Sequence, residues 1–242
     1  MKETIIWSGY TWLNRERWGR IHPEHSRAWN DPNCVEIRDG MLVLKTRKSP
    51  SSFIVNGKIV ETTVGIGLVS NRKKFGHGYF EIEAKLPTGK NLWPAFWMWS
   101  FDSWPPEIDV FEAYTSKKKG YFKLFPSKWW RFLGFWNVQT NIHFGNKEDG
   151  TKDSIGGLTH WMGFKNPRKN FIKYGCLWTQ EKIELFYNNR KVQTIDDPKI
   201  MKHFENTTMN VIINNHVDYD VDKENPTESE FIIKYFKYEP LK

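Results

Sequence analysis

The chain has 242 residues, of which 39% are hydrophobic and 26% are charged, so it can bury a sizeable core and is not a disordered protein. Its formal net charge of +8 allows a nucleic acid, an anionic membrane surface or an acidic polymer as a partner. No run of about 18 apolar residues occurs, which excludes an ordinary transmembrane helix.

The N-terminal residues 1–12 contain no apolar segment followed by a cleavage signature. We expect a protein that acts outside the cell in its mature form, although this sequence shows no signal peptide, and a cytoplasmic or phage-borne origin stays open. Cys34 and Cys176 are the only cysteines, and they are far apart in the sequence. Their spacing fits no metal site, so we expect two free, buried thiols.

Short strand-like runs with turn residues between them recur along the chain, at intervals of roughly 8 to 12 residues. Two runs in residues 35–46 meet at Asp39-Gly40, a sequence typical of two-residue hairpin turns. Residues 172–194 predict further hairpins, one of them turning at Asn188-Asn189. Residues 196–205 predict one short helix with an aspartate cap and an early proline. The pattern favours an all-β sandwich, with residues 1–242 as a single domain.

Residues 104–119, WPPEIDVFEAYTSKKK, place Glu107, Asp109 and Glu112 among apolar side chains. One alternative is a helix, with Ser103 as its cap, prolines in its first turn and lysines at its end. The β-branched and aromatic residues in this stretch, and the strands predicted elsewhere, oppose that alternative.

As a strand, the same stretch places Glu107 and Asp109 on one face, because alternate side chains point the same way. A single β-bulge after Asp109 shifts the register and returns Glu112 to that face. Crowded carboxylates raise one another's pKa and favour a shared proton. Glycoside hydrolysis requires that condition, since one acid attacks while ionised and another donates a proton.

EIDVFE at residues 107–112 resembles the E-x-D-x-x-E signature of glycoside hydrolase family 16, in its bulged form. Similarity extends to residues 75–100, to residues 174–192 and to the closing strands, from about residue 35 to the end. The resemblance implies a β-jelly roll of two antiparallel sheets with an open concave cleft. It also implies that Glu107 is the nucleophile, that Glu112 is the general acid/base, and that Asp109 helps to keep these two in opposite protonation states.

Further residues are expected to bind the substrate. Trp93 and Trp97 align with the family's groove-lining strand, and Trp104 resembles a residue that lies under the sugar next to the scissile bond. Trp99 shares the parity of Trp93 and Trp97 and is a further candidate. Asn141 and His143 alternate on one face of a predicted strand, together with the weaker candidate Gln139. Arg131 and Trp136 lie in a segment without a clear family counterpart, which we expect to form loops over the cleft.

Residues 113–147 contain no Asp or Glu and seven Lys or Arg residues. This segment is either a solvated basic loop or a basic wall beside a groove for an anionic substrate. Basic and aromatic residues together favour a sulfated or uronic β-galactan of the agar, porphyran or carrageenan type.

The sequence therefore predicts a retaining, endo-acting β-glycosidase that leans to such a galactan. A β-1,3-glucanase (laminarinase) or a transglycosylase on the same scaffold is the alternative, and a non-catalytic lectin is a remote one. We expect a monomer that binds a polysaccharide, without a nucleic-acid or membrane partner. No metal site and no required cofactor are predicted, although relatives often carry a structural calcium ion on the convex face.

Overall fold

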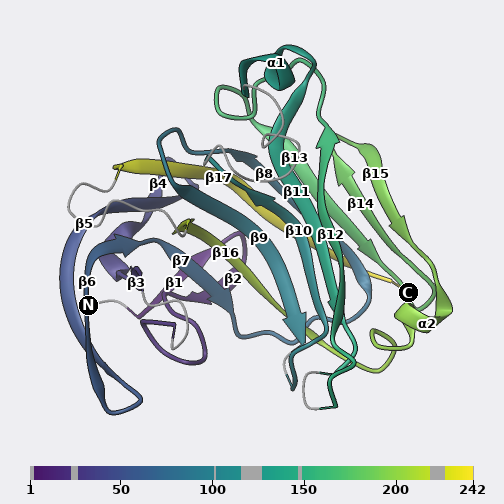
Figure 1. Ribbon diagram of the computed structural model, residues 1–242, viewed down its shortest axis with the longest axis horizontal. Coiled ribbons are helices and arrows are strands. Elements are labelled where there is room, and N and C mark those ends of the chain that lie inside the picture. The colour runs from purple at the N-terminus through teal and green to yellow at the C-terminus, as the bar shows by residue number, and fades with distance from the viewer. Residues whose placement is uncertain are drawn as a thin grey trace.

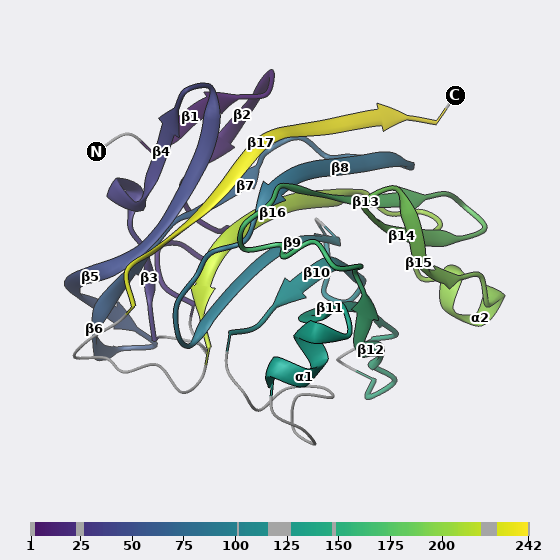
Figure 2. The ribbon, with the colours of Figure 1, turned by 90° about the horizontal axis from the view of Figure 1, so that it is seen from above.

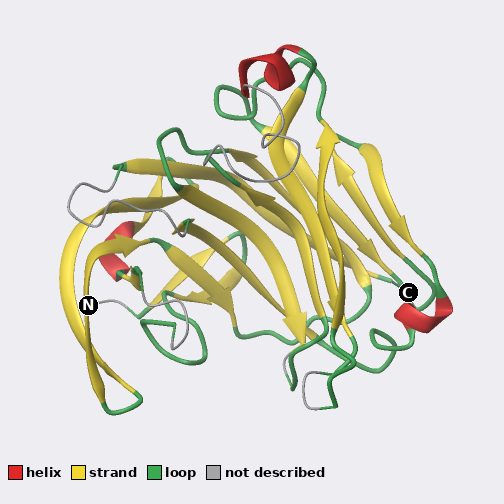
Figure 3. Ribbon diagram, viewed as in Figure 1, coloured by secondary structure: helices red, strands yellow, loops and turns green. Residues whose placement is uncertain are grey.

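A computed structural model describes residues 3–22, 27–100, 102–115, 127–146, 149–218 and 227–241. Strands make up most of it, and the helices are short (Figure 3). Two large β-sheets lie face to face, and both are strongly curved (Figures 1 and 2). The predicted all-β sandwich is confirmed.

The first sheet presents its outer face to the candidate site. Its strands, in spatial order, are β1 (Thr4–Trp7), β2 (Tyr10–Leu13), β7 (Leu68–Asn71), β16 (Met209–Val217), β9 (Leu92–Ser100), β10 (Glu107–Ala113), β11 (Phe135–Phe144) and β12 (Asp153–Trp161). β10 therefore lies between β9 and β11, and it pairs with both in antiparallel fashion.

The second sheet covers the inner face of the first. Its strands, in spatial order, are β15 (Arg190–Ile195), β14 (Ile183–Tyr187), β13 (Ile172–Trp178), β8 (Gly78–Lys85), β17 (Ser229–Pro240), β5 (Met41–Val55), β6 (Lys58–Ile66) and β3 (Trp29–Asn30), with β4 (Val35–Arg38) paired to β5. The helical segments are η1 (Pro32–Cys34), α1 (Ser127–Phe132) and α2 (Pro198–Met201).

The turns follow from their residues. β4 and β5 join at Asp39 and Gly40, with φ of 51° and 76°, and left-handed values at both positions suit a tight hairpin turn. Asn188 and Asn189 adopt φ of 53° and 65° between β14 and β15. Both predicted hairpin turns are confirmed.

The predicted short helix is present but shorter than residues 196–205. α2 spans Pro198–Met201, and the Asp197 carboxylate caps it by accepting from the Lys199 N–H at 2.9 Å. Cys34 and Cys176 are free and buried, as predicted. Among the described residues, no helix is long and apolar enough to cross a membrane.

A large apolar core fills the space between the sheets, and alternation decides which side chains enter it. In β9, Phe96 and Met98 are fully buried in the core. Trp93, Trp97 and Trp99 have the opposite parity, and they line a cavity on the outer face. The core therefore fixes which residues of each strand reach the site.

Candidate active site

The acids of β10 reach the outer face through a β-bulge. Glu107 pairs with His143 and Asp109 pairs with Asn141, but Glu112 pairs with Gln139, so the register with β11 shifts between Asp109 and Glu112. Val110 and Phe111, two consecutive residues, both point into the core and are fully buried. This extra inward residue returns Glu112 to the face of Glu107 and Asp109. The helix alternative is therefore excluded, and the predicted bulge is present.

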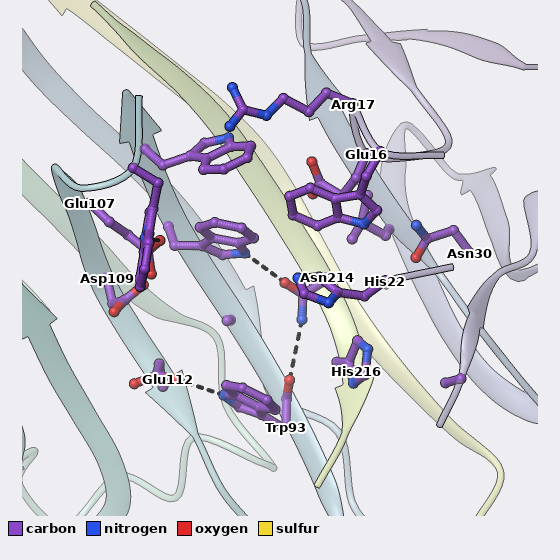
Figure 4. Close-up of a pocket in the computed structure, with 17 residues that line it drawn as sticks. Glu16, Arg17, His22, Asn30, Trp93, Glu107, Asp109, Glu112, Asn214 and His216 are labelled. Atoms are coloured by element: carbon purple, nitrogen blue, oxygen red, sulfur yellow. Dashed lines mark hydrogen bonds between the residues drawn. The ribbon is translucent and has the colours of Figure 1, made fainter. Parts of the chain in front are cut away.

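All three acids line one cavity of about 480 Å³ (Figure 4). Tryptophan rings form much of its surface: Trp18, Trp93, Trp97, Trp99 and Trp104. Such a surface suits a sugar, because the faces of pyranose rings pack on aromatic rings while polar groups fix their hydroxyls.

Glu107 is held by an indole donor. Trp104 Nε1 donates to Glu107 Oε2 at 2.6 Å. The net pKa of Glu107 is raised to about 7: burial and the charge of Glu112 raise it, whereas the hydrogen bonds from Trp104 and Asp109 and the charge of Lys152 lower it. The donors Trp104 and Asp109 therefore favour the ionised form of Glu107.

Asp109 lies between the other two acids and is 4% exposed. Burial, followed by the charges of Glu107 and Glu112, raises the pKa of Asp109 well above its ordinary value. The hydrogen bond between Asp109 and Glu107 lowers the pKa of Glu107 and raises that of Asp109. Asp109 therefore stays protonated and donates a hydrogen bond to Glu107, and Glu107 is the first of the two to ionise.

Two donors converge on one oxygen of Glu112. Trp93 Nε1 donates to Glu112 Oε1 at 2.9 Å, and the Tyr114 hydroxyl donates to the same oxygen at 2.8 Å. The rings of Trp93 and Tyr114 are stacked, with centroids 5.5 Å apart. Burial and the Glu112 charge raise the pKa of Tyr114, so its hydroxyl remains a donor.

His143 lies directly across from Glu107 in the sheet. His143 Nε2 is 3.8 Å from Glu107 Oε1 and 3.6 Å from Asp109 Oδ2, and the Asn141 amide lies 3.0 Å from the same nitrogen. Burial lowers the pKa of His143 to about 4, with a smaller effect from Lys152. His143 is therefore neutral near pH 7 and adds no positive charge beside the acids.

Glu107, Asp109 and His143 also bring ligand-type atoms within 4.8 Å of one another. Calcium takes oxygen ligands, so a set that includes an imidazole does not suit it. The calcium ion expected on the convex face stays a prediction.

Two predicted binding residues lie away from the cavity. Trp136 is 9% exposed and packs in the core, and the Arg131 guanidinium lies 5.9 Å from its ring centroid. The prediction that Trp136 lies over the cleft was wrong for a physical reason: Trp136 has the parity of the core residues Val138 and Ile142. Arg131 is exposed on α1, and its place over the cleft stays a prediction. Residues 116–126, which hold most of the predicted basic wall, lie outside the described residues.

β16 contributes residues that the sequence analysis missed. Trp97 Nε1 donates to Asn214 Oδ1 at 2.7 Å, and Asn214 Nδ2 donates to the Trp93 carbonyl at 3.3 Å. His216 also lines the cavity (Figure 4). Alternation was an available signal, because Asn214 and His216 have the parity opposite to the core residues Val211 and Ile213.

Loops supply the remaining residues that were missed. Lys152 Nζ lies 3.9 Å from the Trp104 ring centroid and lowers the pKa of both Glu107 and His143. On the other side of the cavity, Glu16 and Arg17 come from the loop after β2. No motif marks these positions.

Comparisons with known proteins agree with this geometry. The family model for glycosyl hydrolases family 16 matches residues 22–235. An endo-1,3-1,4-β-glycanase, EglC, of Rhizobium meliloti is 26% identical over 172 residues, which are 70% of this chain and 32% of EglC. Glucan endo-1,3-β-glucosidase A1 of Niallia circulans is 27% identical over 200 residues, 78% of this chain and 26% of that protein. The chain thus spans about a third or less of the length of these relatives.

A solved structure shares the fold. The laminarinase catalytic domain from Thermotoga maritima superposes with a TM-score of 0.65 at 16% sequence identity, covering 89% of this chain and 84% of that one. The two-sheet jelly roll predicted from the sequence is therefore confirmed.

Proposed function

The chain belongs to glycoside hydrolase family 16, and on this basis we propose that it is a retaining endo-β-glucanase that hydrolyses internal β-1,3 or β-1,4 linkages of a neutral glucan. The observation that carries the proposal is the bulge of β10. It places Glu107 and Glu112 on one face of one strand, each held by an indole donor, with Asp109 between them.

In the first step, the ionised Glu107 attacks the anomeric carbon of the sugar at the cleavage site. Glu112 donates its proton to the glycosidic oxygen, so the bond between that carbon and oxygen breaks and the leaving chain departs as an alcohol. A covalent ester between Glu107 and the sugar results. Two inversions at the anomeric carbon, one in each step, retain its configuration.

In the second step, Glu112 is the base. It removes a proton from a water molecule, whose oxygen attacks the anomeric carbon and releases Glu107 as a carboxylate. The donors Trp93 and Tyr114 hold one oxygen of Glu112 in place through both steps, while the other oxygen exchanges the proton.

Asp109 supports the nucleophile. Protonated Asp109 donates a hydrogen bond to Glu107. This bond stabilises the Glu107 carboxylate, so Glu107 can ionise beside two other acids. Neutral His143 adds no charge next to Glu107. The site therefore holds one ionised attacking group and keeps protons on its neighbour.

Charge around the cavity favours a neutral glucan over the anionic galactan to which the sequence leaned. Among the described residues, four acids line the cavity, Glu16, Glu107, Asp109 and Glu112, while two basic groups lie at it, the Arg17 guanidinium in its lining and the Lys152 ammonium at the ring of Trp104. A sulfate or uronate group would be placed among carboxyl groups there. The relative A1 is named a glucan endo-1,3-β-glucosidase, which supports the same choice, and EglC is named an endo-1,3-1,4-β-glycanase, which supports the linkages.

A substrate panel tests the proposal. Laminarin, mixed-linkage β-glucan, agarose, porphyran and carrageenans are incubated with the enzyme, and reducing ends are measured for each. We expect release from laminarin or mixed-linkage glucan, with oligosaccharides of several lengths at early times. Cleavage of sulfated galactans alone would overturn the substrate class, and binding without cleavage of any polymer would overturn the enzymatic activity.

A further inference from the structure

A short loop outside residues 22–235, the part matched by the family model, forms one wall of the cavity. It follows β2, and Glu16, Arg17 and Trp18 all line the cavity. The loop closes between Glu16 and Gly19, whose N–H donates to the Glu16 carbonyl at 3.1 Å. Glu16 and Arg17 lie across the cavity from Glu107 (Figure 4).

Neighbouring strands hold this loop in place. The Ser70 hydroxyl of β7 donates to the Arg15 carbonyl at 2.6 Å. The Asn30 N–H of β3 donates to the Arg20 carbonyl at 2.6 Å, and Arg20 Nη1 donates back to the Asn30 carbonyl at 3.1 Å. The side chains between Arg15 and Arg20 are therefore presented to the cavity by a fixed backbone.

The Glu16 carboxyl is buried, and within the described part of the chain no group meets the geometry of a hydrogen bond to its oxygens. Glu16 is 1% exposed, and neither of its oxygens has a hydrogen-bonding partner among the described residues. Burial raises the pKa of Glu16 to about 8, the backbone N–H and charge of Arg17 offset part of this rise, and the charge of Glu107 adds to it. At neutral pH this carboxyl is mainly protonated, so it offers one donor and an acceptor.

A second polar atom of the same cavity also lacks a partner. Trp99 is 5% exposed and lines the cavity, and its Nε1 has no hydrogen-bond partner within the described chain. The Arg17 guanidinium lies 3.9 Å from the Trp99 ring centroid, and the Trp18 ring meets Trp99 edge-on at 5.2 Å. Folded proteins rarely leave such atoms unsatisfied, and exceptions call for a ligand or a functional role.

We propose that Glu16 and Trp99 bind the hydroxyl groups of an uncharged sugar unit of the substrate, in a subsite whose outer wall is the loop of residues 16–18. A protonated carboxyl can donate to one ring hydroxyl and accept from its neighbour, and the indole N–H can donate to a third. The ring of Trp18 supplies an apolar surface for the sugar face. Glu16 lines the cavity and both of its oxygens are buried, so on binding the side chain turns toward the sugar.

This inference rests on the proposed function, since it names a subsite for the same glucan. It adds that the N-terminal loop, and not only the strands of the sheet, selects the substrate. A negatively charged sugar would lie near the carboxylate of Glu107, which disfavours it.

The test compares Glu16→Gln and Glu16→Leu with the unsubstituted enzyme. Chromogenic β-glucan oligosaccharides of increasing length serve as substrates, and kcat, KM and thermal unfolding are measured. For Glu16→Leu we expect KM for the longer substrates to rise about tenfold, with kcat nearly unchanged, because a hydrogen bond to substrate is lost. The gain in kcat/KM on lengthening the substrate should shrink, and Glu16→Gln should be affected less.

Thermal unfolding separates this role from a structural one. Removal of an unpartnered buried carboxyl should leave Tm unchanged or raise it, whereas loss of a structural contact would lower it. Glu239→Gln, at an exposed glutamate remote from the cavity, is the matched control and should change neither KM nor Tm.

The outcomes distinguish the inference from the proposed function. An unsubstituted enzyme that cleaves these glucans, with KM unchanged in both Glu16 variants, overturns only the inference. A KM rise that is equal at all substrate lengths, or is accompanied by a lower Tm, also overturns it. Failure of the unsubstituted enzyme to cleave any glucan contradicts the proposed function, and it also contradicts the inference of a glucan subsite.

Discussion

Buried acids lie on two walls of the same cavity, but the two walls treat them differently. On β10, Glu107 and Glu112 each accept a hydrogen bond from an indole, and Asp109 donates to Glu107. On the loop after β2, Glu16 has no hydrogen-bond partner among the described residues. Burial raises carboxyl pKa values on both walls, but only on β10 do hydrogen bonds hold the carboxyl groups in fixed orientations.

This difference distinguishes the acids of β10, which react with the substrate, from Glu16, which binds it. A nucleophile and an acid must be aimed before the substrate arrives, because misplacement slows the chemical step. A binding group gains most of its hydrogen bonds from the substrate itself. We therefore read the β10 wall as catalytic and the loop wall as recognition, and the following changes should affect the two walls in opposite ways.

The largest effect is expected on the β10 wall. Glu107→Gln and Glu112→Gln remove the nucleophile and the proton donor, so each should lower kcat by about 10³-fold or more. Release of reducing ends from laminarin or mixed-linkage glucan measures this loss. Glucan binding, followed by tryptophan fluorescence, and Tm should stay close to those of the unsubstituted enzyme. Near-normal turnover in either variant would contradict the assignment.

A large effect on stability, and not on binding, is expected on the inner side of the same sheet. Trp136→Ala removes a buried ring, which should lower the free energy of unfolding by about 3 kcal/mol in denaturant titrations. Trp129→Ala on α1 is the control: this ring is 60% exposed, and its removal should cost less than about 0.5 kcal/mol. Equal effects of the two changes would place Trp136 outside the core.

The loop wall should make stability depend on pH. Glu16 has an ordinary pKa of 4.5 and a folded-state pKa of about 8, so between these values the unfolded chain binds fewer protons than the folded protein. The free energy of unfolding therefore falls as pH rises through this window. Between about pH 6 and 8, Glu16→Gln should remove about 2 kcal/mol of that fall, while the contribution of Glu107, with a pKa of about 7, remains.

Denaturant titrations at pH 5, 6, 7 and 8 measure this slope. Parallel curves for Glu16→Gln and the unsubstituted protein would show that Glu16 is not buried as a neutral acid. A steeper fall in the variant would also contradict the account.

The smallest effect distinguishes two indole donors of the cavity. Trp104→Phe removes the donor to Glu107 and should raise the pKa of Glu107, so the acid limb of kcat/KM moves to higher pH and activity at pH 6 falls about tenfold. Trp97→Phe loses a bond to Asn214 instead and should leave the acid limb in place. A pH profile of kcat/KM for both variants checks this, and equal shifts would contradict it.

Sequence reasoning located the β10 wall because its signal is local. The spacing of Glu107, Asp109 and Glu112 matches one face of a strand only if a bulge intervenes. The positions of these three residues in the sequence therefore suffice to predict the bulge. The hairpin turns at Asp39-Gly40 and Asn188-Asn189 were predictable for the same reason, since few residues tolerate left-handed φ.

The rest of the cavity depends on contacts between distant segments. Asn214 meets Trp97 only because β16 pairs with β9, and Glu16 faces Glu107 only because a loop folds over the same sheet. Neither position has a motif. Trp136 is a different case, because its parity opposite to Asn141 and His143 already placed it on the core face.

The identity of the attacking carboxylate is the central claim, and a trapped intermediate tests it most directly. The enzyme is incubated with a 2,4-dinitrophenyl 2-deoxy-2-fluoro β-glucan oligosaccharide, which forms the glycosyl ester but slows its hydrolysis, and the labelled peptide is sequenced by mass spectrometry. We predict one sugar label, on Glu107, and a label at Glu112 or at no carboxyl group despite release of dinitrophenol would contradict the account.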